Sequence, residues 1–256
     1  MPLIQQRGIW KPAGMAAALS IRTTYTPPDQ LPPYADDLGA DGLVRYKYRG
    51  TEPDLSDNRA LRTACVLQLP LIYFVGIAHG VYTAHYPVWI LGEDRSRLEF
   101  MVAVDAGQRD PGVDVAWPDR DYVLRLTRQR LHQPVFRARV LLAYDDACAV
   151  CRLRHAELLD AAHILPDTHP RGTPVVPNGL ALCKIHHAAY DQNILGVRPD
   201  LVIEVQTRVL LERDGPMLRH GLQEIHGASL SVPRSRHARP DPDRLEERYE
   251  EFRAAS

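Results

Sequence analysis

The stretch that decides the fold runs from residue 148 to residue 191 and contains three short motifs. They read CAVC at 148–151, LDAAHILPD at 159–167 and PNGLALCKIHHAAYD at 177–191. The stretch holds three of the four cysteines and five of the eleven histidines of the chain. So many metal-ligating side chains in one short segment indicate a metal-binding domain.

Two ligand pairs stand out within these motifs. Cys148 and Cys151 form a C-x-x-C pair, and Cys183 and His186 form a C-x-x-H pair. A two-residue spacer lets both side chains of a pair turn toward one tetrahedral ion, and two pairs complete a closed Zn²⁺ site. Because four protein ligands fill the coordination of that ion, we predict a structural zinc.

The composition is that of an ordinary globular protein. The chain has 256 residues, of which 45% are hydrophobic and 25% charged, and this length fits one large domain or two modest ones. No apolar run reaches the about 18–20 residues that span a bilayer, and the N-terminus lacks the order of a signal peptide. We therefore expect no membrane association and a cytoplasmic location, where thiols stay reduced and available to metal.

The formal net charge of −1 does not indicate a general electrostatic attraction to nucleic acid. Arginines are nevertheless concentrated in residues 120–139, which carry Arg120, Arg125, Arg128, Arg130, Arg137 and Arg139. A balanced total can therefore hide a basic face, although ordinary solvated arginines explain the charge pattern equally well.

The chain divides into three predicted parts with an α+β fold overall. Residues 1–118 form a β-rich, barrel-like domain, with strand-like runs at 43–50, 70–78, 80–92 and 98–105 that favour an antiparallel sheet or a small barrel. Within it, residues 57–67 read as a helix with Asp57 as its N-cap.

Residues 119–147 form a connecting helix that is broken or kinked at Pro134. Residues 148–256 form the metal domain. Within it, the metal-ligating motifs are followed by a strand at 199–205 and helices at 214–227 and 241–255.

The order C-x-x-C, A-H-I-x-P, N-G-L-x-L-C-x-x-H-H resembles the HNH endonuclease family over residues 136–198. The resemblance implies a ββα-metal finger, in which two strands and a helix hold a divalent ion and a histidine against a scissile phosphate. It implies that His163 is the general base, that Asn178 fixes the loop or ligates metal, and that His187 serves the active site.

The chemistry of these residue types agrees with the implied roles. The pKa of imidazole lies near neutrality, which suits His163 to proton transfer, although a histidine between Ala162 and Ile164 also suits a core. Asn178 begins an Asn-Gly step, which is first of all a turn signal.

His187 directly follows the zinc ligand His186, and adjacent helix positions point about 100° apart. One ring can therefore serve the structural zinc while the other serves catalysis. Asp191 lies four residues beyond His187 on the same helical face, so the pair forms a partial shell for Mg²⁺ or Mn²⁺. An ordinary exposed position explains Asp191 equally well.

One position departs from the family pattern. Many members have Asp or His directly before the base, where it ligates metal, and this chain has Ala162. Asp160 lies two residues away on the same strand face, and we predict it as the substitute ligand. Arg137, Arg139 and Arg171 are predicted to clamp neighbouring phosphates.

The first domain is predicted to read DNA. The order of domains resembles restriction endonucleases in which an SRA- or PUA-like domain precedes an HNH domain. Its aromatic residues could form a core or stack a flipped base. In RYKYRG (45–50), Arg45, Lys47 and Arg49 are nominated for DNA contact, with a basic edge strand as the alternative.

Three functions follow as hypotheses. The first is a metal-dependent HNH restriction endonuclease that cuts double-stranded DNA, with a requirement for modified bases left open. The second is a zinc-stabilised DNA-binding protein with a degenerate nuclease site, and the third is an RNA-directed HNH nuclease. A double-strand cut by one active site per chain would favour a homodimer.

Overall fold

The computed structural model describes residues 3, 8–27, 37–39, 41–109 and 131–255. They belong to two compact units, Met1–Val135 and Phe136–Ser256. Residues 119–130 of the expected connecting helix lie outside the described residues, as do Arg120, Arg125, Arg128 and Arg130. No described helix has the length and apolar character needed to cross a bilayer.

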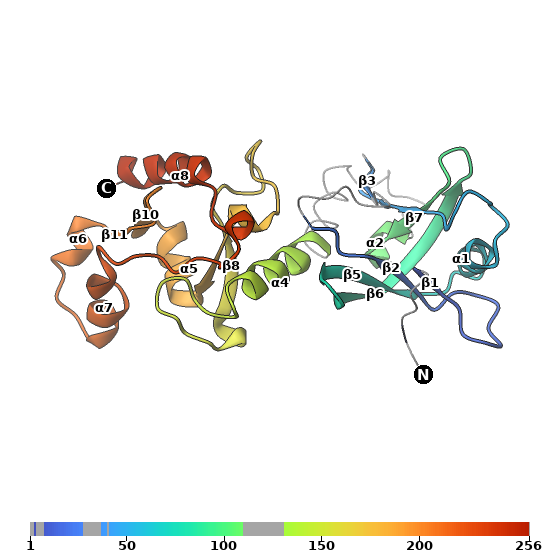
Figure 1. Cartoon of the computed structure of the whole chain (residues 1–256), viewed down its shortest axis with the longest axis horizontal. Helices are drawn as coiled ribbons and strands as arrows, with labels where there is room; N and C mark the ends of the chain where they lie inside the picture. The colour runs from blue at the N-terminus through green and yellow to red at the C-terminus, as the bar shows by residue number, and fades with distance from the viewer. Residues whose placement is uncertain (1–2, 4–7, 28–36, 40, 110–130, 256) are drawn as a thin grey trace. The chain divides into compact units, whose positions relative to one another are not determined.

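The first unit is built on a seven-stranded sheet, and the four predicted strands are confirmed within it (Figure 1). In spatial order the strands are β1 (Ile9–Trp10), β2 (Ser20–Thr23), β5 (Leu71–Ala78), β6 (Val81–Asp94), β7 (Glu99–Ala103), β4 (Val44–Lys47) and β3 (Asp37–Leu38). In the part of this unit that the structure describes, helices α1 (Ser56–Val66) and α2 (Ala106–Arg109) accompany them.

The long strand β6 makes the sheet curl. Its first half pairs with β5 up to Val88, and its second half, from Trp89, pairs with β7. The sheet starts at β1 and ends at β3, which do not pair with each other among the described residues, so it is an open, curled sheet. The expectation of a purely antiparallel sheet is wrong at one place, since β2 runs parallel to β5.

Helix α1 begins differently from the prediction. Leu55 is its N-cap residue and no side chain caps the helix, so the prediction of Asp57 as N-cap is wrong. Asp57 lies inside the first turn, where its carboxylate pairs with Arg49. An acid in the first turn still stabilises the helix through the helix dipole.

The second unit contains short strands and helices that surround a β-hairpin. Its elements are α4 (Gln133–Ala143, which begins just before the boundary), β8 (Leu159–His163), β9 (Gly179–Cys183), α5 (Lys184–Asp191), β10 (Leu195–Val197), β11 (Ile203–Val205), α6 (Thr207–Leu210), α7 (Pro216–Gly221) and α8 (Pro242–Ala254). The predicted strand at 199–205 is shorter than expected, and the predicted helix at 214–227 ends at Gly221 and is followed by a 3₁₀ turn.

The hairpin and the helix after it form a ββα unit. Strands β8 and β9 are antiparallel, with Leu159 opposite Cys183 and His163 opposite Gly179. Leu159, Leu180 and Leu182 are fully buried in the core of this unit. Helix α5 begins directly after β9, so the chain passes from strand to helix at Cys183.

Helix α8 anchors the end of α5. Asp241 caps α8 by accepting hydrogen bonds from the backbone, as expected for an N-cap aspartate. The buried Arg248 donates to the carbonyl oxygen of Tyr190 at 2.6 Å, and its guanidinium lies 4.6 Å from the centre of the Tyr190 ring. This contact fixes the helix that carries His186 and His187.

Candidate metal and nuclease centre

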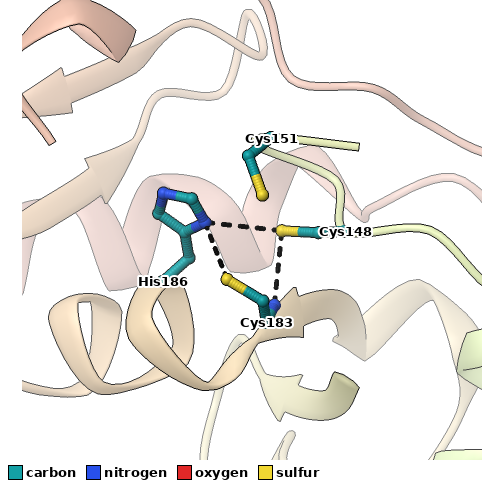
Figure 2. Close-up of side chains that lie close together, drawn as sticks. All are labelled: Cys148, Cys151, Cys183 and His186. Carbon is teal, nitrogen blue, oxygen red and sulfur yellow. Dashed lines mark hydrogen bonds between the residues drawn. The ribbon is translucent and has the colours of Figure 1, made fainter. Parts of the chain in front are cut away.

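Four side chains converge on one point in the second unit, as the sequence predicts (Figure 2). The ligand atoms of Cys148, Cys151, Cys183 and His186 all lie within 4.8 Å of one another. The Cys183 Sγ lies 3.1 Å from His186 Nδ1, and the Cys148 Sγ lies 3.5 Å from the same nitrogen. Three thiols and one imidazole are a ligand set that Zn²⁺ favours.

The surrounding backbone prepares His186 to bind a cation. Its Nε2 hydrogen donates to the carbonyl oxygen of Gly221 at 2.8 Å, so the Nδ1 lone pair faces the sulfurs. Burial acts to lower the pKa of His186, but hydrogen bonds to the sulfurs of Cys148 and Cys183 outweigh it and raise the pKa to about 10. Without a metal ion the raised pKa means that Nδ1 carries a proton toward the sulfurs, and a metal ion would take the place of that proton. The sequence could not predict the role of Gly221, because every residue has a backbone carbonyl and residue type does not show which one accepts a hydrogen bond.

His163 ends strand β8, and its ring is held in a fixed plane. The ring stacks on Phe136 of α4, with 4.1 Å between ring centres and 19° between planes. Its Nε2 is buried and makes no hydrogen bond to any described residue, and Oδ1 of Asp167 lies 3.7 Å away. Burial lowers the pKa of His163 against the opposing charge of Asp167. The ring is therefore neutral at neutral pH, as a general base requires.

Gly179 makes this stacking possible. Its backbone is extended, with φ −131° and ψ 142°, so the Asn-Gly step forms no hairpin turn here. A Cβ at this position would lie 2.5 Å from Cγ2 of Val140 and 2.9 Å from Cζ of Phe136. The residue opposite His163 therefore has no side chain because α4 occupies that space.

We expect Gly179→Ala to destabilise the second unit by about 1–3 kcal/mol, the usual cost of overpacking a core. It should also displace Phe136 from His163. Urea unfolding measures the first effect. Gly215→Ala is the control, since a Cβ there meets no atom within 4 Å and the change at this N-cap should cost less than about 1 kcal/mol. Equal stability of both variants would contradict the close approach of α4 to β9.

Asn178 is fully buried and its amide fixes the loop between β8 and β9. Its Oδ1 accepts from the backbone N–H of Leu165 at 3.0 Å, and its Nδ2 donates to the carbonyl oxygens of Leu165 and Thr173 at 2.9 and 3.1 Å. The resemblance implied that Asn178 either fixes the loop or ligates metal, and these hydrogen bonds agree with the first role.

His187 lies between two carboxylates. Its Nδ1 is 3.5 Å from Oδ2 of Asp160, and its Nε2 is 3.4 Å from Oδ2 of Asp191. Each carboxylate therefore lies nearest to a different nitrogen of the ring. Among the described residues, only the Cys148–Cys151–Cys183–His186 cluster brings three or more such ligand atoms within 4.8 Å of one another. Asp160, His187 and Asp191 therefore form two pairs and not one group of three.

Asp160 is also held by basic neighbours. Its carboxylate accepts a short hydrogen bond from Lys184 and lies 3.5 Å from Nε of Arg137. Burial acts to raise the pKa of Asp160, but the contacts with Lys184 and His187 outweigh it and keep the pKa below its ordinary value. Ala162, on the same strand, is fully buried in the core of the unit.

The arginines predicted to clamp phosphates differ in their surroundings. Arg137 donates to the carbonyl oxygens of Ala156 and Leu159 at 2.9 and 2.7 Å, so it holds the start of β8. Arg171 pairs with Glu247. Arg139 lies half-buried on α4.

The basic residues nominated in the first unit all have acidic partners. Arg45 pairs with Asp41 and Glu99, Lys47 with Glu99, and Arg49 with Asp57. Strand β4, which carries Arg45 and Lys47, pairs with β3 on one side and β7 on the other, so it is not the edge strand of the alternative interpretation.

Most of the aromatic residues between positions 46 and 89 are buried in the first unit. The buried ones are Tyr46, Tyr48, Tyr73, Phe74 and Trp89. Tyr82 is half-buried, whereas the side chain of Tyr86 is 67% exposed. Of the aromatic residues in this set, Tyr86 is the most accessible to a partner.

Comparison with known proteins confirms the resemblance in the second unit. Residues 148–198 match the model of a family described as HNH endonuclease. A solved structure described as "Modification dependent TagI restriction endonuclease" aligns with 16% sequence identity and a TM-score of 0.33, covering 96% of this chain and 85% of that chain. No curated protein matches the chain in sequence. The likeness of the first unit to SRA or PUA domains stays a prediction.

Proposed function

We propose that this protein is a metal-dependent HNH endonuclease that hydrolyses phosphodiester bonds in double-stranded DNA. The observation that carries the proposal is the β8–β9–α5 unit, which presents His163, His187 and Asp191 outside the closed Cys₃His cluster. These residues stand in the order of the family whose model matches residues 148–198.

Two metals complete the proposed centre. Zn²⁺ at Cys148, Cys151, Cys183 and His186 has a structural role and stabilises the fold, because its four ligands leave no open coordination position. Mg²⁺ or Mn²⁺ is held by His187 and Asp191, whose nitrogen and oxygen lie 3.4 Å apart. When bound, this second ion neutralises charge on the phosphate and on the leaving 3′ oxygen.

The protein side chains supply the base and its geometry. His163 takes a proton from the attacking water, and Phe136 keeps the imidazole plane fixed during the transfer. The carboxylate of Asp160 lies 3.5 Å from Nδ1 of His187 and favours a proton on that nitrogen, which leaves Nε2 free to face the metal position, a supporting role in place of the direct ligation expected from sequence. Asn178 holds the loop that follows the base.

The first unit is proposed to direct cleavage to particular DNA, in a restriction enzyme that responds to modified bases. Support comes from its existence as a separate β-rich unit and from the exposed Tyr86, since aromatic faces stack on bases. Paired cleavage of both strands would bring two chains together.

A DNA-binding protein with a degenerate nuclease site is the second candidate, favoured by one observation. Ala162 offers no ligand where many family members have one, and its side chain is buried in the core. The number of protein ligands for the second metal is then two, which weakens metal binding.

Cleavage assays distinguish these functions. Plasmid DNA that is unmodified, 5-methylated or 5-hydroxymethylated at cytosine is incubated with the protein and Mg²⁺ or Mn²⁺, with a structured RNA in parallel. We expect cleavage of DNA only when a divalent ion is added, and faster cleavage of one modified substrate. Binding of DNA without cleavage under every condition would support the degenerate site, and cleavage of RNA alone would support the RNA-directed nuclease.

A further inference from the structure

The two nitrogens of His163 lie in different surroundings. Nε2 is sealed from solvent and has no hydrogen bond to a described residue, and the carboxylate of Asp167 lies 3.7 Å from it. Since Nε2 is sealed, a water molecule can reach a ring lone pair only at Nδ1. The side chain of His163 is 20% exposed and that of Asp167 is 29% exposed, so both lie at the border of the core.

These surroundings select one tautomer of the neutral ring. A neutral imidazole carries its proton on one nitrogen and its lone pair on the other. A buried N–H beside a carboxylate is favourable, whereas a buried lone pair beside a carboxylate is repelled and left without a donor. The proton therefore belongs on Nε2, and the lone pair that can act as base belongs on Nδ1.

The loop after β8 holds Asp167 in this place. Its turn is closed by hydrogen bonds from His169 N to Pro166 O and from Gly172 N to His169 O, both at 2.8 Å. A Cβ on Gly172 would lie 1.8 Å from Pro166 O, so only glycine permits this packing. Asn178 binds both ends of the loop, at Leu165 and at Thr173.

Other charges also act on the His163 ring, from helix α5. His187 opposes protonation of the ring and Asp191 favours it, and both effects are smaller than that of Asp167. Asp167 therefore dominates among the charged groups that face His163.

We propose that Asp167 is the positioning residue of the general base: its carboxylate, 3.7 Å from Nε2 of His163, holds the ring proton on Nε2 by its charge, so that the lone pair of Nδ1 takes a proton from water. This inference rests on the proposed function. As the water oxygen bonds to phosphorus, its proton passes to Nδ1 and the bond from phosphorus to the 3′ oxygen breaks. The leaving oxygen takes a proton from solvent, and Asp167 stabilises the imidazolium until it returns its proton to solvent.

The tautomer of His163 can be measured without any cleavage. Nitrogen-15 NMR of the zinc-loaded full chain, with His163→Gln for assignment, reports which ring nitrogen carries the proton. We expect the Nε2–H form in the wild type, and an increase of the Nδ1–H form in Asp167→Ala. The control Glu157→Ala removes an exposed acid from the same unit and should leave the spectrum of His163 unchanged.

Kinetics complete the test. Asp167→Ala is expected to lower kcat by about 10- to 100-fold with little change in KM, as for the loss of a hydrogen bond to a charged group. Asp167→Glu should recover part of kcat, because a carboxylate returns. Nδ1–H in the wild type, or an unchanged tautomer and kcat in Asp167→Ala, would overturn the proposal. If Nε2–H is found but no nucleic acid is cleaved, the orientation of His163 stands and the nuclease function fails.

Discussion

Loss of metal from the Cys148–Cys151–Cys183–His186 cluster is expected to unfold the second unit. Cys148 and Cys183 are buried members of the same core as Leu159 and Leu182, so an opened cluster opens that core. The strands of this unit are only three to five residues long. Structural zinc contributes about 10–16 kcal/mol in zinc-finger peptides, a range comparable with the whole stability of most domains, about 5–15 kcal/mol.

The measurement compares wild type with Cys148→Ala. Wild-type protein should contain bound zinc by mass spectrometry of metals, and chelation should increase digestion by trypsin within residues 136–256. Cys148→Ala should behave like the chelated protein. Cys65→Ala is the control, because Cys65 lies on α1 of the first unit and outside the cluster. A fully folded Cys148→Ala variant, or wild-type protein without zinc, would contradict a structural metal.

The local spacing of residues predicted much of this centre. The ligand pairs follow from the spacing in C-x-x-C and C-x-x-H, because each pair depends on neighbours within a few positions. The resemblance to the HNH family implied the hairpin and the helix. Four of the seven described strands of the first unit were predicted as well, since alternation such as buried Tyr46 between the half-buried Arg45 and Lys47 is a local property. The short strands β1, β2 and β3 were not predicted.

The sequence could not predict interactions between residues that lie far apart in the chain. Lys47 pairs with Glu99, and the two are 52 residues apart in the chain. The Gly221 carbonyl that orients His186 lies 35 residues from it. The space that Phe136 occupies explains Gly179, whereas the local pattern of Asn-Gly predicts a turn. Asp160 is the same case, because alternation places it on the correct face but cannot show which ring nitrogen it meets.

His163→Ala is expected to lower the rate of DNA cleavage by about 10²- to 10⁴-fold, the usual contribution of a general base. The reason is specific to this ring, since its plane is fixed by Phe136 and burial keeps it neutral at neutral pH. The rate is measured under single-turnover conditions with saturating Mn²⁺. Zinc content should not change, because His163 is not part of the Cys₃His cluster.

Binding and control variants separate catalysis from folding in this experiment. His163→Ala should bind DNA as tightly as wild type, since the ring contributes a proton acceptor and not a charge at neutral pH. His155→Ala is the matched control, because His155 is an exposed histidine of the same unit outside the centre. His187→Ala should lose activity in a different way, with a rate that recovers partly at high Mn²⁺, since it removes a proposed ligand and leaves the base. If His163→Ala kept more than about a tenth of the wild-type rate, the loss of rate would be smaller than the smallest loss expected for a general base. Proton transfer would then belong to another group.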